Sequence, residues 1–136
     1  MFGLDRFSAP LLSAMRFISG LLFLEHGTAK LFTFPLTQMF PHPPQLGTPQ
    51  GTMLLSAGVL ELVGGALVAL GLFTRPVAFI LSGQMAVAYW LVHAPQSPFP
   101  AVNQGDAAIL FCFIFLYIAA AGGGSIGLDA ALRKKV

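Results

Sequence analysis

Nine polar residues of this chain lie in or beside long apolar segments, and their side chains could together bind a polar ligand or transfer a proton. They are Glu25, His26, Lys30, Glu61, Gln84, Tyr89, His93, Asn103 and Asp106. An ionisable group inside an apolar segment is costly unless it has a partner, so its presence is a reason to look for a function. These nine residues are the candidate polar site, and none of them is assigned a catalytic role.

Three of these residues have matching depths in the two apolar segments that carry them, and a fourth, Lys30, lies nearer the outer interface. At a rise of about 1.5 Å per helical residue, His26 and Glu25 lie roughly 10 to 14 Å from one end, and Glu61 lies roughly 12 Å from the same side. Lys30 follows His26 by four residues, which makes the two side chains neighbours on one helix face. Glycines share the helix face of Glu61 and allow another helix to approach closely. We expect Glu61 to lie within a few ångströms of His26 or Lys30.

The expected cluster around Glu61 has two interpretations. It is either a buried network that only fixes how the helices pack, or a site for a ligand or a proton. A ligand site needs concave volume as well as polar groups, so the second interpretation predicts a cavity that reaches toward Tyr89, His93 or Asp106. The sequence leaves both interpretations open.

The remaining candidates gather near the same side of the predicted membrane, and each has a structural alternative. Asn103 and Asp106 stand at the start of a segment, where their side chains can cap free helix amides. His93 can be an interfacial residue, and Tyr89 can belong to the aromatic belt. Cys112 is the single cysteine, which excludes an internal disulfide, a CxxC motif and a self-contained dithiol mechanism. We interpret it as a structural thiol.

Composition places the chain in a membrane. Of its 136 residues, 56% are hydrophobic and 9% are charged, against roughly 25% charged in soluble globular domains. The net charge of +2, without a basic stripe interleaved with aromatic residues, argues against nucleic-acid binding. No metal site and no nucleotide or flavin fingerprint is predicted, so the chain is expected to have no intrinsic cofactor.

Four apolar segments, at about 9–34, 53–73, 77–93 and 105–122, predict an all-α integral membrane protein with four transmembrane helices. They form one membrane domain over residues 1–136. Strands are excluded because the segments lack alternating hydrophobicity. The first segment is expected to be an uncleaved span and not a signal peptide, because Arg16 interrupts its apolar region. Residues 128–135 predict a short interfacial helix or a plain basic tail.

The distribution of lysine and arginine predicts the orientation. Arg6 precedes the first span, Arg75 separates the second from the third, and Arg133, Lys134 and Lys135 follow the fourth. Because cytoplasmic connections are enriched in these residues, we expect both termini in the cytoplasm and both proline-rich connections outside. The expected location is the inner (plasma) membrane of a bacterium, with several membrane passes.

Three sets of residues resemble the motifs of the DoxX family of small bacterial membrane proteins. They are Arg16, Gly20, Phe23, His26, Gly27, Lys30, Leu31 and Phe32 in the first span; Glu61, Gly64, Gly65, Gly71, Leu72, Thr74 and Arg75 in the second; and Asn103, Gly105, Asp106, Leu110 and Phe111 in the fourth. The ending Gly124, Ser125, Leu128 and Asp129 is also similar. The resemblance spans nearly the whole chain and implies a four-helix protein of the inner membrane.

The resemblance implies several activities. Some DoxX relatives are linked to thiosulfate-to-quinone electron transfer, and some to an oxidative-stress complex with a thiol-handling sulfurtransferase and a superoxide dismutase. Distant animal relatives are linked to assembly of membrane receptors. Because this chain lacks a cysteine pair and a haem-ligating histidine pair, a partner or a quinone would have to carry electrons.

The leading function hypothesis is an accessory, or quinone- or small-molecule-binding, subunit of a redox or oxidative-stress system. Its polar site lies in the outer half of the bundle, and a bound quinone is the cofactor that it suggests. The expected partners are the lipid bilayer and a partner protein or further copies of this chain. One alternative is a non-catalytic assembly protein whose polar cluster is structural, and a weaker one is a small transporter.

Overall fold

The structure, a computed structural model, describes residues 3–133, and every regular element in that range is helical. The principal helices are α1 (Ser8–Phe32), α2 (Pro49–Leu70), α3 (Thr74–Ala88) and α5 (Asp106–Ala121). The short elements are the 3-10 turn η1 (Leu4–Phe7), the π-helical η2 (Tyr89–His93) that continues α3, α4 (Pro100–Asn103) and α6 (Leu128–Arg133). The predicted all-α architecture is confirmed for these residues.

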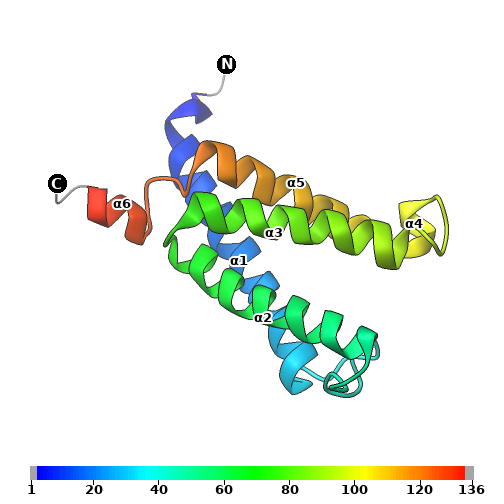
Figure 1. Ribbon diagram of the computed structural model, residues 1–136. Helices are drawn as coiled ribbons and strands as arrows, with labels where there is room; N and C mark the ends of the chain where they lie inside the picture. Colours follow the sequence, from blue (N-terminus) through cyan, green and yellow to red (C-terminus); the bar gives the residue numbers. More distant parts are fainter. Residues whose placement is uncertain (1–2, 134–136) are drawn as a thin grey trace.

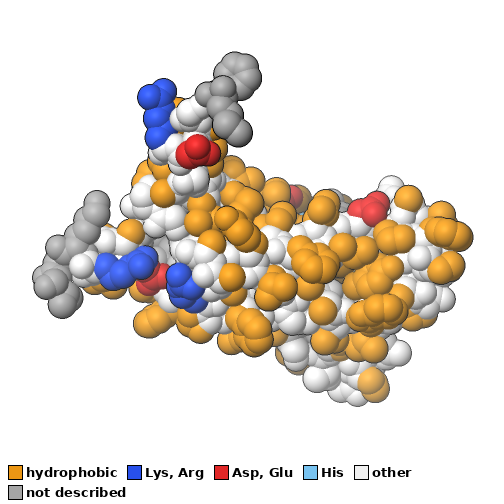
Figure 2. All heavy atoms as spheres, turned by 90° about the horizontal axis from the view of Figure 1, so that it is seen from above, with side chains coloured by type: hydrophobic (Ala, Val, Ile, Leu, Met, Phe, Trp, Pro, Cys, Tyr) orange, Lys and Arg blue, Asp and Glu red, His pale blue; other side chains and the backbone are white. Residues whose placement is uncertain are grey.

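Three helical segments are long and apolar enough to cross a membrane. They are Leu4–Phe32, Pro49–Leu70 and Thr74–His93, with 29, 22 and 20 residues, against the roughly 20 that span a bilayer core. The apolar helix α5 is shorter, with 16 residues. Hydrophobic side chains cover most of the face seen in Figure 2, with Lys and Arg side chains gathered toward its left end. The protein is therefore built as a multi-pass membrane bundle.

The principal helices pack as two pairs, α1 with α2 and α3 with α5. In Figure 1 the two pairs meet near α6 and diverge toward the ends that carry the 33–48 connection and α4. Phe23 of α1, Leu81 of α3, and Phe115 and Ile118 of α5 are almost completely buried and form the core between the pairs. The core therefore holds the two pairs together along only part of their length.

Glycines allow α1 and α2 to pack with their backbones in close approach. A Cβ atom added at Gly20 would lie 2.5 Å from the backbone nitrogen of Ala69, and one at Gly27 would lie 2.4 Å from that of Leu62. On α2, a Cβ atom at Gly65 would lie 2.5 Å from the backbone nitrogen of Leu24. No other residue type fits these positions without separating the helices, as in small-residue membrane interfaces.

The bundle has two chemically different ends. We call the end with the 71–73 turn, the 122–127 loop and α6 the basic end. The opposite end, with the 33–48 and 94–99 connections, is the proline-rich end. The first and last described segments both lie at the basic end, where the Ser125 amide approaches the carbonyl of Ala9 at 3.5 Å.

Several helix boundaries differ from the predicted spans because proline is tolerated in the first turn of a helix, where its missing N–H has no intrahelical partner. Helix α2 begins at Pro49, and the Thr48 side chain caps it by accepting a 3.0 Å bond from the Gly51 amide. Helix α3 begins at Thr74, with Pro76 inside its first turn. Of the predicted 128–135 helix, residues 128–133 are helical and 134–135 lie outside the described range.

Candidate functional site

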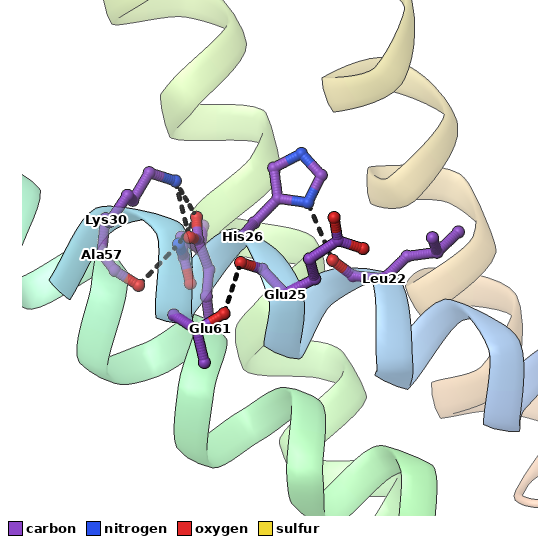
Figure 3. A network of polar contacts seen from close by, with 8 residues as sticks. Leu22, Glu25, His26, Lys30, Ala57 and Glu61 are labelled. Atoms are coloured by element: carbon purple, nitrogen blue, oxygen red, sulfur yellow. Dashed lines mark hydrogen bonds and ion pairs between the residues drawn. The ribbon is translucent and has the colours of Figure 1, made fainter. Parts of the chain in front are cut away.

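Three helices contribute to a hydrogen-bonded cluster near the proline-rich end. The Lys30 ammonium group of α1 donates to both carboxylate oxygens of Glu61 on α2, at 2.5 Å to Oε1 and 2.6 Å to Oε2. Gln84 Nε2 of α3 donates to the same Oε1 at 3.0 Å. Figure 3 shows Lys30 and Glu61 pointing toward each other. The expected contact of Glu61 with Lys30 is present.

The cluster is deeply placed but not closed on every side. Glu61 is 1% exposed, and the Lys30 side chain is 12% exposed. The lack of a side chain at Gly58 makes room for Leu31 and for the stem of Lys30: a Cβ atom added there would lie 2.8 Å from Leu31 Cγ and 3.3 Å from Lys30 Cβ. The ring of Phe40 faces the Lys30 ammonium group at 5.0 Å from its centroid. Gln84 Oε1 is buried and has no hydrogen-bond partner, so one acceptor of the cluster remains free.

His26 lies on the exposed side of α1 and forms no hydrogen bond with the cluster. Its Nδ1 is 2.8 Å from the carbonyl of Leu22, as Figure 3 shows. Since a carbonyl only accepts, Nδ1 carries the proton of this bond, and in the neutral ring Nε2 is a free acceptor. The ring meets Phe111 of α5 edge-on, with centroids 6.0 Å apart. Glu25 is exposed as well.

Three other candidates form a second group, around η2 and α4. His93 Nδ1 is 2.9 Å from the carbonyl of Asn103, and the Tyr89 and His93 rings stack at 6.5 Å between centroids. Asn103 is buried, and its side chain donates to the Ser97 carbonyl at 2.8 Å and accepts from the Gly105 amide at 2.7 Å. Contacts thus place six of the nine candidates in two groups, and Glu25, His26 and Asp106 belong to neither.

The predicted capping role holds for neither residue, since no side chain caps the first amides of α5. Asn103 Oδ1 accepts from the Gly105 amide, which precedes α5 and also donates to the carbonyl of Pro100 at 3.2 Å. Asp106 is the exposed first residue of α5 and forms no side-chain cap, so its capping interpretation is wrong. The physical reason is that the turn at Gln104, with its left-handed φ of 58°, already directs Asn103 onto the Gly105 amide. The helix start then leaves Asp106 pointing outward.

A hollow lies at the other end of the molecule. It measures about 360 Å³ and is lined by residues of the 73–76 segment, the 122–123 turn and α6. The cavity expected beside Glu61 stays a prediction. Within residues 3–133, no three His, Cys, Asp or Glu side chains gather in a way that could hold a metal ion.

The basic end contains a network that the sequence did not predict, centred on Arg16 of α1. Arg16 is 3% exposed, and its guanidinium donates to the carbonyls of Val68 and Ala69 at the end of α2, the latter at 2.6 Å. It also donates to Gly123 at 2.9 Å and Ile126 at 2.8 Å in the 122–127 loop. One side chain thereby satisfies backbone acceptors of a helix end and a loop, which have no intrahelical donors.

Two more charged residues cap helix ends beside this network. The Asp129 carboxylate of α6 accepts from the amides of Phe73 at 3.0 Å and Thr74 at 2.9 Å, at the start of α3. Burial acts to raise the pKa of Asp129, but the Thr74 and Phe73 contacts and the charge of Arg133 outweigh it and lower the pKa. Arg75 donates to the last carbonyls of α5, including that of Ala120 at 2.5 Å. These bonds tie α6 to the start of α3, and α3 to the end of α5.

A signal for this network was present in the sequence. Arg16 is the one basic residue deep in the half of the bundle opposite Glu61, and no carboxylate of the spans shares its depth. A guanidinium without a counter-ion in a span needs several oxygen acceptors. Glycines at 71 and 122–124 mark the chain turns where helix carbonyls become free. Joining these two observations would have indicated the capping role.

Comparison with known proteins identifies the family of this chain. The DoxX family profile matches residues 11–94, a range that contains Arg16, Lys30, Glu61 and Gln84. The chain belongs to the DoxX family. This DoxX chain is 41% identical over 138 aligned positions to a curated protein of Haemophilus influenzae described as "Uncharacterized protein". The alignment covers 99% of this chain and 100% of the relative. No solved structure matches the chain.

Proposed function

We propose that this DoxX protein is an inner-membrane protein with four spans, in which the apolar α5 supplies the fourth crossing. A locally thinned bilayer accommodates its 16 residues. In this orientation the basic end faces the cytoplasm, because Arg6, Arg75 and Arg133 all lie there. The shared location of the first and last described segments supports an even number of crossings. A reporter fused after Val136 should behave as cytoplasmic, and one inserted near Gln45 as exported; the reverse result contradicts the orientation.

The proposed role is that of an accessory subunit that binds a quinone headgroup, or a small molecule of similar polarity, in a redox or oxidative-stress system. The observation that carries this proposal is the Lys30–Glu61–Gln84 cluster, with the free Nε2 of His26 on the adjacent face of α1. A bound quinol hydroxyl can donate to Nε2 of His26 or to Oε1 of Gln84, and the third N–H of Lys30 can donate to a quinone carbonyl. The apolar surfaces of α1 and α5 suit an isoprenoid tail.

The proposed headgroup position lies between the helix pairs, where they diverge toward the proline-rich end. There the edge of the His26 ring faces Phe111, so an aromatic wall and a polar acceptor are adjacent. The ion pair behind them supplies both a proton donor and a proton acceptor within one hydrogen-bonded unit. A partner subunit exchanges electrons with the quinone, and the chain itself holds and orients it.

Quinone binding can be measured directly on the protein in lipid nanodiscs. Isothermal titration with decylubiquinone, corrected with empty nanodiscs, is expected to give a saturable signal that weakens at least about tenfold in His26→Ala, the loss of about 1.4 kcal/mol of binding free energy. Glu25→Gln is the matched control, because Glu25 is exposed on the same turn but bonds no cluster residue. Equal binding by His26→Ala and the unmodified protein would contradict the proposal.

A second function is favoured by the complete pairing of Glu61, whose two oxygens already accept three bonds. In this alternative the protein is a membrane assembly factor, and the cluster only holds α1, α2 and α3 in register. It predicts that Glu61→Gln lowers the melting temperature in detergent while decylubiquinone has no effect on either protein. Stabilisation of the unmodified protein by decylubiquinone, lost in His26→Ala, would exclude it.

A further inference from the structure

The hollow of about 360 Å³ at the basic end is lined by side chains of two kinds. Arg75 and Arg133 contribute guanidinium groups, and Phe73, Pro76 and Leu132 contribute apolar surface. Phe73 is 63% exposed and Leu132 is 56% exposed, so the apolar groups open outward. A volume of this size accepts a small polar headgroup.

Both arginines keep hydrogen-bond donors for a ligand. A guanidinium has five N–H donors; Arg75 uses its Nη groups on the carbonyls that end α5, and Arg133 uses Nε on the carbonyl of Asp129. The Asp129 carboxylate also lines the hollow, but its two oxygens are bound to the α3 amides. The lining therefore carries two positive charges and one negative charge that is already compensated.

A buried hydroxyl at the same place also lacks a partner. Thr74 is 1% exposed, it lines the hollow, and its Oγ1 forms no hydrogen bond. Thr74 Oγ1 lies near enough to the Asp129 carboxylate to favour the charged form of that carboxylate. The two groups do not, however, meet the geometry of a hydrogen bond. Gly123 faces this hydroxyl, since a Cβ atom added there would lie 3.0 Å from Oγ1. An unpaired buried hydroxyl is unfavourable unless a ligand or a small shift satisfies it.

We propose that this hollow binds the phosphate group of an anionic phospholipid, with Arg75 and Arg133 as its ligands and Thr74 as a further donor. Guanidinium groups bind phosphate oxygens in a fork geometry, and basic pockets at helix ends are suited to lipid headgroups. The exposed apolar side chains of Phe73 and Leu132 then lie where acyl chains begin. Free phosphate shares this chemistry, so the test separates the two sources.

Lipid retention measured by native mass spectrometry tests the site. The purified protein is mixed with equal amounts of phosphatidylglycerol and phosphatidylcholine and released from detergent micelles. The unmodified protein should retain phosphatidylglycerol preferentially. Arg133→Gln should reduce this retention about fivefold, as expected for one basic residue near an anionic lipid. Within the described residues 3–133, Arg133 hydrogen-bonds only the Asp129 carbonyl of its own helix, so its substitution removes no hydrogen bond between helix pairs.

Two more variants and one competing anion make the result specific. Arg6→Gln is the matched charge control, because Arg6 is exposed near the same end and stacks on Phe7 instead of lining the hollow. Thr74→Val should lower phosphatidylglycerol retention without lowering the melting temperature. Equal losses in Arg6→Gln and Arg133→Gln, or no loss in Arg133→Gln, would overturn the site. Stabilisation by inorganic phosphate alone, abolished by Arg133→Gln, would keep the anion site but overturn the lipid as its source.

Discussion

At the proline-rich end a carboxylate of α2 is paired with an ammonium group of α1, whereas at the basic end the arginine of α1 binds backbone carbonyls. Glu61 and Lys30 satisfy each other through side chains, with Gln84 as a third partner. Arg16 instead bonds carbonyls that belong to the end of α2 and to the 122–127 loop. The same physical problem, a charge inside an apolar bundle, thus has two solutions in one chain.

The two ends differ in whether a side chain can gain or lose a proton without disrupting the fold. Among the described residues, the carbonyls of Ala69 and Ile126 accept only from Arg16, so their pairing at this end depends on one permanent positive charge. The proline-rich end holds a proton donor and a proton acceptor in contact, and a proton transferred between them leaves all helix ends capped. The first arrangement suits structure, and the second also suits ligand binding or proton exchange.

The largest effect is expected for Arg16→Leu. Removing the guanidinium leaves the carbonyls of Ala69 and Ile126 without a donor, at about 1–3 kcal/mol for each, and also removes bonds to Val68 and Gly123. We expect too little folded protein for purification, or a loss of stability above about 4 kcal/mol in unfolding by dodecyl sulfate. Arg16→Lys should recover only part of it, because an ammonium group has three N–H donors and no planar fork. An Arg16→Leu protein as stable as the unmodified one would remove the distinction between the two ends.

The next effect concerns the ion pair. Lys30→Met leaves Glu61 buried without its counter-ion and should destabilise the bundle by about 3–5 kcal/mol, measured by the same unfolding assay. The double variant Lys30→Met/Glu61→Gln should recover most of this loss, because no buried charge remains. Additive effects in this double-mutant cycle would show that the two side chains do not interact.

Glycine substitutions test whether close helix packing is needed to bring Lys30 and Glu61 together. Gly27→Ala places a Cβ atom against the backbone of α2, within 2.4 Å of the Leu62 nitrogen, and should cost about 1–3 kcal/mol. Gly83→Ala is the matched control, since nothing lies within 4 Å of a Cβ atom there. It should be neutral or slightly stabilising because alanine favours the helix. Equal destabilisation by the two variants would contradict a tight α1–α2 contact.

The sequence predicted features set by neighbouring residues better than contacts between residues far apart in the chain. The apolar segments and the depth of Glu61 follow from periodicity and helical rise, and they predicted the helical class and the Lys30 contact. The start of α2 at Pro49 was missed because proline was taken only as a helix breaker.

The partners of Arg16 and Asp129 could not be derived from spacing. They are backbone groups from segments more than fifty residues away in the sequence, and backbone acceptors carry no residue-type signal. The same limit applies to the division of the polar candidates. Whether His93 meets Asn103 or Glu61 depends on the η2 and α4 geometry, which periodicity does not specify.

The smallest effect is expected at the cap that Asp129 provides for α3. Asp129→Asn keeps one amide acceptor but loses the charge, so it should lower stability by about 0.5–2 kcal/mol at neutral pH. Because the folded-state pKa of Asp129 is lowered, its contribution is complete above the ordinary value of 3.8 and disappears as the pH falls through the lower folded-state pKa. Melting temperatures of the unmodified protein and Asp129→Asn should therefore differ at pH 6 and converge in the acid range below 3.8. Asp106→Asn is the control, since exposed Asp106 begins α5 without capping it. If Asp106→Asn lowered stability as much as Asp129→Asn, with the same pH dependence, the contribution of Asp129 would come from general charge and not from its helix cap.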